Sequence, residues 1–167
     1  ELQYNFQPNP SHNIVLGGGY RYSRDKTGWF YPYIYLSPES KTDHLKSLFL
    51  QDDITLLPAI LNLDLGIRIE HNDYTNYEYQ PTARLAWTPS NKHSFWTAIT
   101  RAVRTPSRSQ DGIVAQPLAL FGSTSLKAES LIAYEAGYRH QPSGLLWLDL
   151  ALFYNDYQDL IGVTATS

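Results

Sequence analysis

The chain has 167 residues, and its 13 lysines and arginines against 16 acidic residues give a formal net charge of −3. This balance argues against nucleic acid as a partner, because nucleic-acid binders usually carry a basic surface. The sequence contains no cysteine, which excludes disulfides and thiolate metal sites.

Period-two alternation recurs along the chain and predicts long β-strands. In the clearest case Leu61, Leu63, Leu65, Ile67 and Ile69 share one face, whereas Asp64, Arg68 and Glu70 share the other. About seven such segments of 11–16 residues are expected: 11–24, 43–56, 61–73, 78–88, 93–104, 129–141 and 145–160. Strands in globular proteins are typically about 5–6 residues long, so this length needs a cause. Helical period is nearly absent, with short candidates only around 38–48 and 116–121.

The connections between these segments alternate in length. Long connections at 25–42 and 105–128 and a medium one, "TNYEY" at 75–79, are separated by short turns rich in Pro, Ser and Asn. Every second turn therefore lies at the same end of the sheet, and one end carries all the extended loops. Short turns at one end and long loops at the other are typical of transmembrane β-barrels. The pattern predicts an all-β, antiparallel up-and-down meander that forms part of such a barrel.

The strand length also suits a bilayer, because a tilted strand crosses the hydrocarbon layer in roughly 9–11 residues. Aromatic side chains near both strand ends suggest interface girdles. They are Trp87, Phe95, Trp96 and Trp147 by the short turns and Tyr74, Tyr77, Tyr79 and Tyr157 by the long loops. Adjacent Asp52 and Asp53 conflict with an apolar face, so one is expected beyond the apolar band or in a bulge. A soluble antiparallel sheet with one wet face alternates in the same way and stays an alternative.

Five segments carry a resemblance to a known family. "TRAVRTPSR" (100–108), "LKAESLIAYEAGYR" (126–139) and "LDLALFYNDYQDLI" (148–161) resemble successive strands of TonB-dependent outer-membrane receptors. "SLFLQDDITLLP" and "YQPTARLAWTP" are similar to further segments of the family, in the same order along the chain. The resemblance covers most of residues 11–161.

The resemblance implies a barrel of about 22 strands with a plugged lumen. It also implies TonB-energised uptake of a scarce ligand such as a ferric siderophore or cobalamin across the outer membrane of a Gram-negative bacterium. On this reading residues 1–167 are a partial barrel domain, without the plug domain and the remaining strands. Its partners would be outer-membrane lipid, the TonB complex through the plug region and an unknown small ligand.

Two groups of side chains are candidate ligand-binding residues in the long loops. Arg101, Arg104 and Arg108 come where the strand at 93–104 leaves the apolar band for the outer surface. They are expected to pair with loop carboxylates such as Asp111, with lipid headgroups or with ligand. Trp29, Tyr31 and Tyr33 could form an aromatic platform, because Trp and Tyr dominate binding hot spots. Solvated charge at a strand end and an interface girdle are the alternatives for the two groups.

Catalytic and metal-binding patterns are not evident in the sequence. The five histidines have no metal-ligand spacing, and Glu70 and His71 should point to opposite faces of a strand. Ser107 and Ser109 have no nearby histidine to activate them. We therefore expect no enzyme, no cofactor and no metal. The rival functions are a soluble β-sandwich that binds carbohydrate and an outer-membrane lipase or protease.

Overall fold

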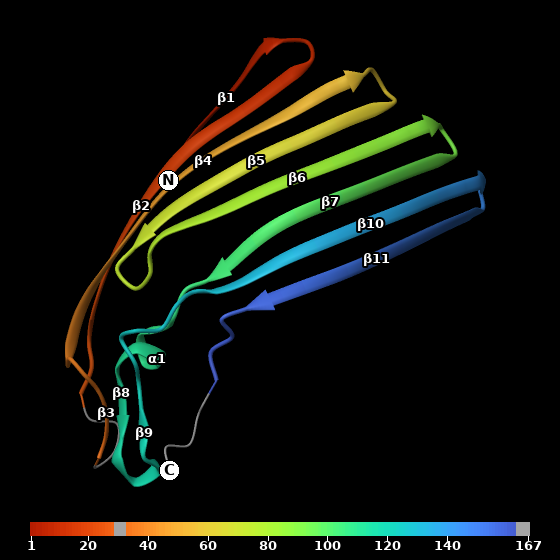
Figure 1. The fold of residues 1–167 in the computed structure, drawn as a ribbon. Coiled ribbons are helices and arrows are strands. Elements are labelled where there is room, and N and C mark those ends of the chain that lie inside the picture. Colours follow the sequence, from red (N-terminus) through yellow and green to blue (C-terminus); the bar gives the residue numbers. More distant parts are fainter. Residues whose placement is uncertain (29–32, 163–167) are drawn as a thin grey trace.

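The computed structural model describes residues 1–28 and 33–162, and one large curved sheet dominates it (Figure 1). The sheet has eight antiparallel strands in the order β1-β2-β4-β5-β6-β7-β10-β11. Their bounds are β1 Leu2–Asn9, β2 His12–Lys26, β4 Ser40–Leu57, β5 Leu61–Asn72, β6 Asn76–Ser90, β7 His93–Arg104, β10 Glu129–Ser143 and β11 Leu146–Gln158. Neighbours in this sheet are also neighbours in sequence, so the predicted meander is confirmed.

The main sheet has eight strands, one more than the seven long segments expected from the sequence. The seven predicted segments correspond to β2, β4, β5, β6, β7, β10 and β11, whereas β1 was not anticipated. Three shorter strands in the long loops were also missed, together with a one-turn helix. They are β3 Ile34–Leu36, β8 Ile113–Ala115, β9 Leu120–Phe121 and α1 Arg108–Gly112. The candidate helix at 38–48 is part of β4, and 116–121 forms a 3₁₀ turn followed by β9.

The two ends of the sheet differ as the connection lengths predict. The turns β1–β2, β4–β5, β6–β7 and β10–β11 span two or three residues and gather at one end, which we call the short-turn end (Figure 1). Residues 27–39 and 105–128 connect strands at the opposite, long-loop end, where the β5–β6 turn also lies. Antiparallel pairing forces this alternation, because each strand carries the chain to the opposite end of the sheet and the next strand brings it back.

Register separates the sheet into an apolar face and a polar face. The row Leu50–Ile67–Pro81 on neighbouring strands belongs to the apolar face, and the next row, Phe49–Arg68–Gln80, belongs to the polar face. The apolar face continues on β11 through Leu148, Leu150 and Leu152, which are each more than half exposed. Glu70 pairs with Glu78 and His71 with Tyr77, so these neighbours point to opposite faces as predicted.

The described residues contain almost no interior of their own. Their buried apolar side chains are three alanines, Ala98, Ala115 and Ala128, and no larger side chain is fully buried. Leu65 and Ile67 remain 41% and 40% exposed on the apolar face. A β-sandwich would cover this face with a second sheet at a spacing of about 10 Å, whereas the main sheet is a single layer. The leucine rows therefore need a partner outside the chain, which a bilayer supplies.

Two of the four aromatic residues expected in the short-turn girdle, Trp96 and Trp147, lie on the wrong face for it. Trp96 is on the polar face and packs flat over Gly137, where an added Cβ would collide with the indole ring. Phe49 covers Gly17 in the same way on β4 and β2. A glycine opposite an aromatic leaves room for the ring to lie across the neighbouring strand. Trp147 also has polar-face register, next to Asp149 on the same face.

A row of stacked rings does form the girdle on the apolar face at the short-turn end. Trp87 stacks on Phe95 with ring centroids 5.2 Å apart, and Phe95 stacks on Tyr138 at 4.6 Å. His93 and His140 extend the row with a centroid distance of 4.3 Å. Aromatic belts mark the membrane–water interface in barrels, so this row places the short-turn interface. Among the described residues, no helix has the length and apolar character to cross a membrane.

Asp52 and Asp53 occupy opposite faces, and neither lies in the β4 bulge, which occurs later, between Thr55 and Leu57. Asp52 lies on the apolar face beside Leu65. The Oδ2 atom of Asp52 is 2.7 Å from Nδ1 of His12, the first residue of β2. The carboxylate is therefore accommodated near the short-turn end by a partner on the same face.

Candidate functional site

The long-loop end is where segments far apart in sequence meet. Strands β3, β8 and β9 form a second, three-stranded sheet, which we call the loop sheet (Figure 1). In it Ile34 lies opposite Ala115 and Tyr35 opposite Val114. The amides of Ser37 and Gln116 extend this pairing by donating to Gly112 O at 2.7 Å and Tyr33 O at 3.2 Å. Residues 33–39 and the loop 105–128 are therefore one folded unit.

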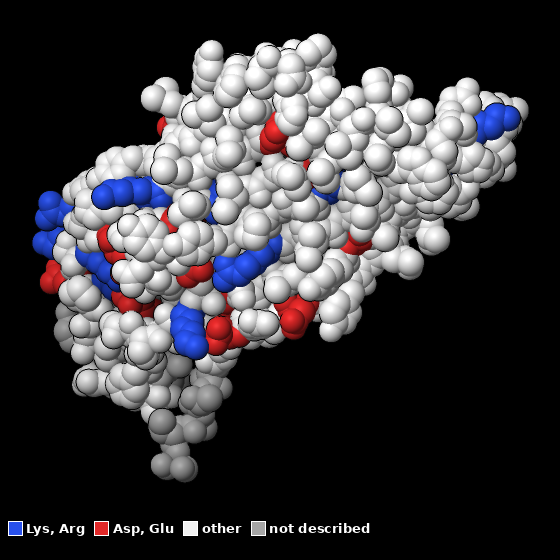
Figure 2. Space-filling view, turned by 45° about the horizontal axis from the view of Figure 1, so that its top comes forward, with Lys and Arg blue, Asp and Glu red and all other residues white. Residues whose placement is uncertain are grey.

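Two ion pairs fasten this unit to the β2–β4 hairpin. Lys41 Nζ lies 2.6 Å from Asp111 Oδ2, and Arg108 Nε lies 3.2 Å from Asp25 Oδ2. Both loop residues are largely buried, with 10% of the Asp111 and 16% of the Arg108 side chain exposed. Asp25, Lys41, Arg108 and Asp111 are called the rim network below. Figure 2 shows opposite charges intermixed at this end of the molecule.

Local structure explains why Arg108 and Asp111 point toward the hairpin. Ser107 caps helix α1 by accepting a hydrogen bond from Gln110 N, and the Gln110 side chain accepts one from Ser107 N. This reciprocal capping box fixes the start of a helix. Arg108 and Asp111 are three residues apart, so they share one side of the turn. Arg108 also donates to the carbonyl oxygens of Ser37 and Pro38 in the other loop.

Tyr74 joins the rim network from the β5–β6 turn. Its hydroxyl donates to Asp43 Oδ2 at 2.9 Å, and Lys41 Nζ lies 3.9 Å above its ring. Burial raises the pKa of the Tyr74 hydroxyl well above its ordinary value, and the hydrogen bond to Asp43 raises it further. The neutral phenol is the donor in its hydrogen bond to Asp43. Asp43 Oδ1 is buried without a hydrogen bond, 3.9 Å from Lys41 Nζ.

Below the loops the main sheet divides between β6 and β7. Their ladder begins at Thr82 and Thr100, whereas β5–β6 pairing continues to Asn76 and β7–β10 pairing continues to Arg104. Pro81, which has no amide hydrogen, stands at the first unpaired position of β6. We call this the β6–β7 split, and Figure 1 shows the two strands diverging there.

Side chains replace the backbone ladder across the β6–β7 split. Arg101 donates to the carbonyl oxygen of Tyr79, and its Nη2 atom lies 3.7 Å from Oε2 of Glu78. Glu78 is only 8% exposed. Thr82 and Thr100 share a hydroxyl hydrogen bond of 3.0 Å at the base of the split. Farther out, the loop sheet and the rim network connect the two sides of the split. Strand β3 belongs to the loop between β2 and β4, whereas β8 belongs to the loop between β7 and β10.

The predicted ligand residues are thus distributed over several environments. Arg108 and Asp111 belong to the rim network but pair with Asp25 and Lys41, not with each other. Arg104 pairs with Glu129 at 2.5 Å across β7 and β10, and 57% of its side chain is exposed. Tyr33 is 58% exposed next to β3. Trp29 and Tyr31 lie outside the described residues, so their role stays a prediction.

The sequence did not predict Asp25 and Lys41 as members of the rim network, or Asp43 and Tyr74 as residues beside it. Lys41 and Asp111 are 70 positions apart, and no local pattern connects them. The one local pattern that points to this site is the pair Lys41 and Asp43, because residues two positions apart lie on the same face of a strand. Residues 1–28 and 33–162 contain no group of three His, Asp or Glu side chains suited to a metal ion.

A protein-family model described as "TonB dependent receptor-like, beta-barrel" matches residues 1–167. The chain belongs to this family. Its members are transporters of the Gram-negative outer membrane and not enzymes, which confirms the predicted location and excludes the lipase or protease alternative. The apolar face therefore meets lipid, and the polar face meets the barrel lumen.

Named relatives support the same placement. A ferric enterobactin receptor from Pseudomonas aeruginosa is 27% identical over 135 residues, which cover 73% of this chain and 18% of that protein. The structure of the siderophore receptor PirA from the same species matches with a TM-score of 0.80 at 20% identity, over 93% of this chain and 30% of that one. PirA from Acinetobacter baumannii gives 0.77 at 15% identity, over 95% and 26%. The chain spans less than a third of the length of these relatives.

Proposed function

We propose that the chain forms about a third of the barrel wall of a receptor that imports a ferric siderophore with energy from TonB. Eight strands are present in the main sheet, and transporters of this type have about 22. The rest of the wall, the plug and the contact with TonB would come from other parts of the receptor. The observation that carries the proposal is the whole-chain family match, together with relatives named for ferric enterobactin and siderophores.

The long-loop end is the proposed ligand-facing side. Its loops are large, lie over the lumen side of the split sheet and are held in one arrangement by the loop sheet and the rim network. Preorganised loops bind with less loss of conformational entropy than mobile ones. A structure of a ferric enterobactin receptor mutant in complex with enterobactin matches this chain with a TM-score of 0.75 at 22% identity, over 93% of this chain and 26% of that one.

Arg104 and Tyr33 are the proposed ligand contacts among the described residues. Arg104 uses Nε for Glu129, and its exposed guanidinium retains further N–H donors for an anionic ligand. Tyr33 presents an exposed ring beside β3, with Trp29 and Tyr31 predicted to add to it. Arg108 and Asp111 are themselves largely buried and already have ion-pair partners, which favours a role in positioning the loops. For these two residues a direct ligand contact stays a prediction.

The test is ligand binding and uptake by the intact receptor carrying Arg104→Ala. We expect affinity for radiolabelled ferric enterobactin to fall about tenfold or more, the effect of losing a hydrogen bond to a charged group. Arg139→Ala is the matched control, because Arg139 also pairs with a carboxylate across two strands, Asp149 at 2.8 Å, but lies at the short-turn end. Cobalamin serves as the competing ligand class. Uptake of cobalamin with no uptake of the ferric siderophore would overturn the proposal. An equal loss of ferric enterobactin affinity in the Arg104→Ala and Arg139→Ala variants would do so as well.

A further inference from the structure

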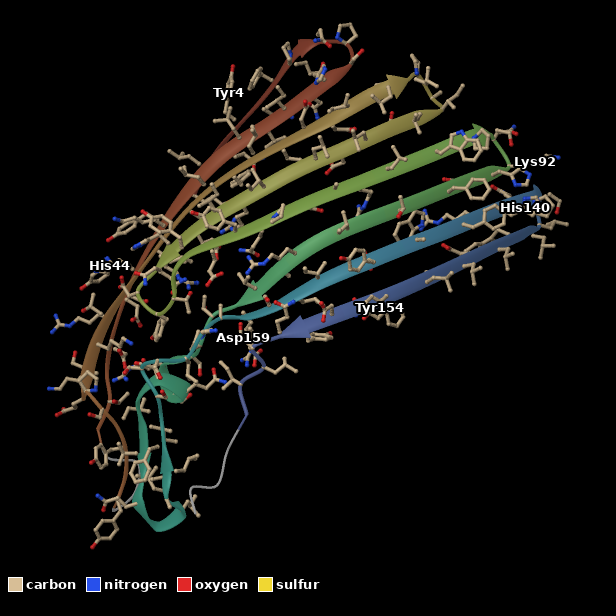
Figure 3. All side chains as sticks on the ribbon, in the orientation of Figure 1. Tyr4, His44, Lys92, His140, Tyr154 and Asp159 are labelled. Carbon is tan, nitrogen blue, oxygen red and sulfur yellow. The ribbon has the colours of Figure 1, made fainter. Side chains whose placement is uncertain are left out.

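The row of stacked rings at the short-turn end finishes with two histidines that face each other. His93 is the first residue of β7 and His140 lies near the end of β10, and the two are direct cross-strand partners on the apolar face. Their rings stack with centroids 4.3 Å apart and an interplanar angle of 20°. Of the five histidines in the chain, these are the two that register places opposite each other. Figure 3 shows His140 close to Lys92 of the β6–β7 turn.

One ring nitrogen of each histidine is held by an oxygen atom. Nδ1 of His140 lies 3.2 Å from the carbonyl oxygen of Lys92, which also accepts from the amide of Gln141 at 2.9 Å. Because a carbonyl oxygen only accepts, Nδ1 of His140 carries the proton and Nε2 keeps a lone pair. Nδ1 of His93 lies 2.9 Å from the Tyr138 hydroxyl, which can accept in the same way. In metal sites the histidine nitrogen that is not bound to the ion usually donates to such an oxygen.

The spacing of the two rings suits a shared ion. A tetrahedral ion with bonds of about 2.0–2.1 Å to two imidazole nitrogens holds these nitrogens about 3–3.5 Å apart. Rings with centroids 4.3 Å apart reach this separation when their Nε2 edges tilt toward each other. The tilt is a rotation about the outer side-chain torsion, which is broad for histidine. The backbone pairing of β7 and β10 therefore needs no change for both nitrogens to meet one ion.

A groove of about 580 Å³ beside the pair gives an ion access from the water at this end of the sheet. Both histidines line it, together with Ser90 and Asn91 at the β6–β7 turn. The carboxylate of Asp149 also lines the groove, but its Oδ2 atom lies 2.8 Å from Nε of Arg139. The two imidazoles are therefore the protein ligands that this site offers, and water completes the coordination.

We propose that His93 and His140 bind one divalent transition-metal ion through their Nε2 atoms and so link β7 to β10 at the short-turn interface. Imidazole suits Cu²⁺, Zn²⁺ and Ni²⁺, and among divalent ions of the first row a given site binds Cu²⁺ most tightly. The pair lies on the face directed away from the lumen. The site is therefore separate from the path of an imported ligand, whatever that ligand is.

The test measures Cu²⁺ binding to the intact receptor, purified without a histidine tag and stripped of metal with a chelator. Isothermal titration calorimetry gives the number of bound ions and their affinity, and pulsed EPR counts the imidazoles bound to each Cu²⁺. On the unaltered receptor we expect an ion that is bound to two imidazoles. If every bound Cu²⁺ had one imidazole ligand or none, the proposal would be overturned without any variant.

Variants then locate the site. His93→Phe and His140→Phe keep an aromatic ring in the stacked row but remove the nitrogens that bind the ion. Each should lower the affinity for this ion at least about tenfold, because losing even a residue that orients a ligand costs that much, and should abolish the two-imidazole signal.

His71→Phe is the matched control. His71 also lies on the apolar face and packs edge-on against Tyr77 at a centroid distance of 4.7 Å, but its cross-strand partners are Lys46 and Tyr77. We expect this variant to bind Cu²⁺ as the unaltered receptor does. An equal loss for His71→Phe, or unchanged binding in either of the other two variants, would contradict the assignment.

Discussion

The two ends of the sheet are held together by different forces. At the short-turn end each hairpin closes within two or three residues, and the β6–β7 ladder continues to Ser90 and His93. At the long-loop end the ladder between β6 and β7 stops at Thr82 and Thr100, and side chains and loops make the connection. Backbone hydrogen bonds depend little on residue identity, whereas ion pairs need particular residues. The long-loop end is therefore the part that substitutions can remodel without disturbing the wall.

The largest expected effect comes from breaking the rim network with Lys41→Met. The change keeps most of the side-chain volume but leaves Asp111 without its partner in a largely buried place. We expect local opening to become easier by roughly 1–3 kcal/mol, so that the amides of Ser37 and Gln116 exchange with deuterium about 10–100-fold faster. Hydrogen–deuterium exchange of the receptor measures this directly.

Lys92→Met provides the comparison for that experiment. Lys92 is an exposed lysine in the β6–β7 turn, and no ion pair involves it within the described residues. The same substitution there should leave the exchange of Ser37 and Gln116 unchanged. If Lys41→Met also left it unchanged, the backbone pairing of β3 and β8 alone would hold the loops.

A smaller effect is expected for Arg101→Gln at the β6–β7 split. The shorter side chain gives up the hydrogen bond to Tyr79 O and leaves the nearly buried Glu78 without its cation. Denaturant unfolding should show a loss of about 1–2 kcal/mol. Arg139→Gln removes an ion pair whose arginine is 63% exposed, and should cost at most about 1 kcal/mol. A larger cost for Arg139→Gln than for Arg101→Gln would refute the contrast between the ends.

The smallest effects concern two alanines with left-handed backbone, one at each end. Ala59 in the β4–β5 turn has φ 60° and Ala119 after the 3₁₀ turn has φ 48°. Glycine adopts this region without a Cβ penalty, so Ala59→Gly should raise the free energy of unfolding by about 0.5–1 kcal/mol. Ala119→Gly should slow amide exchange within 113–121 and leave global unfolding unchanged. A lower stability for Ala59→Gly would show that the turn does not require this conformation.

The strand pattern could be predicted because side-chain alternation is a local property. Residues such as Leu61 to Ile69 face one solvent at every second position, and this leaves a readable period in the sequence. β1 was missed although Leu2, Tyr4 and Phe6 alternate with polar residues, because the strand has only eight residues and includes a proline. The strands β3, β8 and β9 have two or three residues each, which is too short for any period to appear.

The rim could be predicted only in part, because its contacts join residues that the fold alone brings together. The arginines at the outer end of β7 and in the loop after it were expected to meet carboxylates, lipid headgroups or ligand. Arg101, Arg104 and Arg108 do each lie beside a carboxylate. Their partners Glu129 and Asp25 depend on strand order and on the folding of loop 105–128 against the hairpin. The expected pairing with Asp111 was wrong, because Lys41 occupies that carboxylate. Trp96 was misplaced for a similar reason, since only register shows that it lies over Gly137.

The β6–β7 split has a consequence for how the mouth of the barrel can widen. Moving the β2–β4 hairpin away from the β7–β10 hairpin at their outer tips need not rupture a single hydrogen bond of the main sheet. The resistance to such spreading comes from Arg101, the rim network and the loop sheet, and added salt weakens it little because the rim ion pairs are largely buried. Spreading of this part of the mouth would then be controlled by a few side chains, while the membrane-embedded wall stays the same.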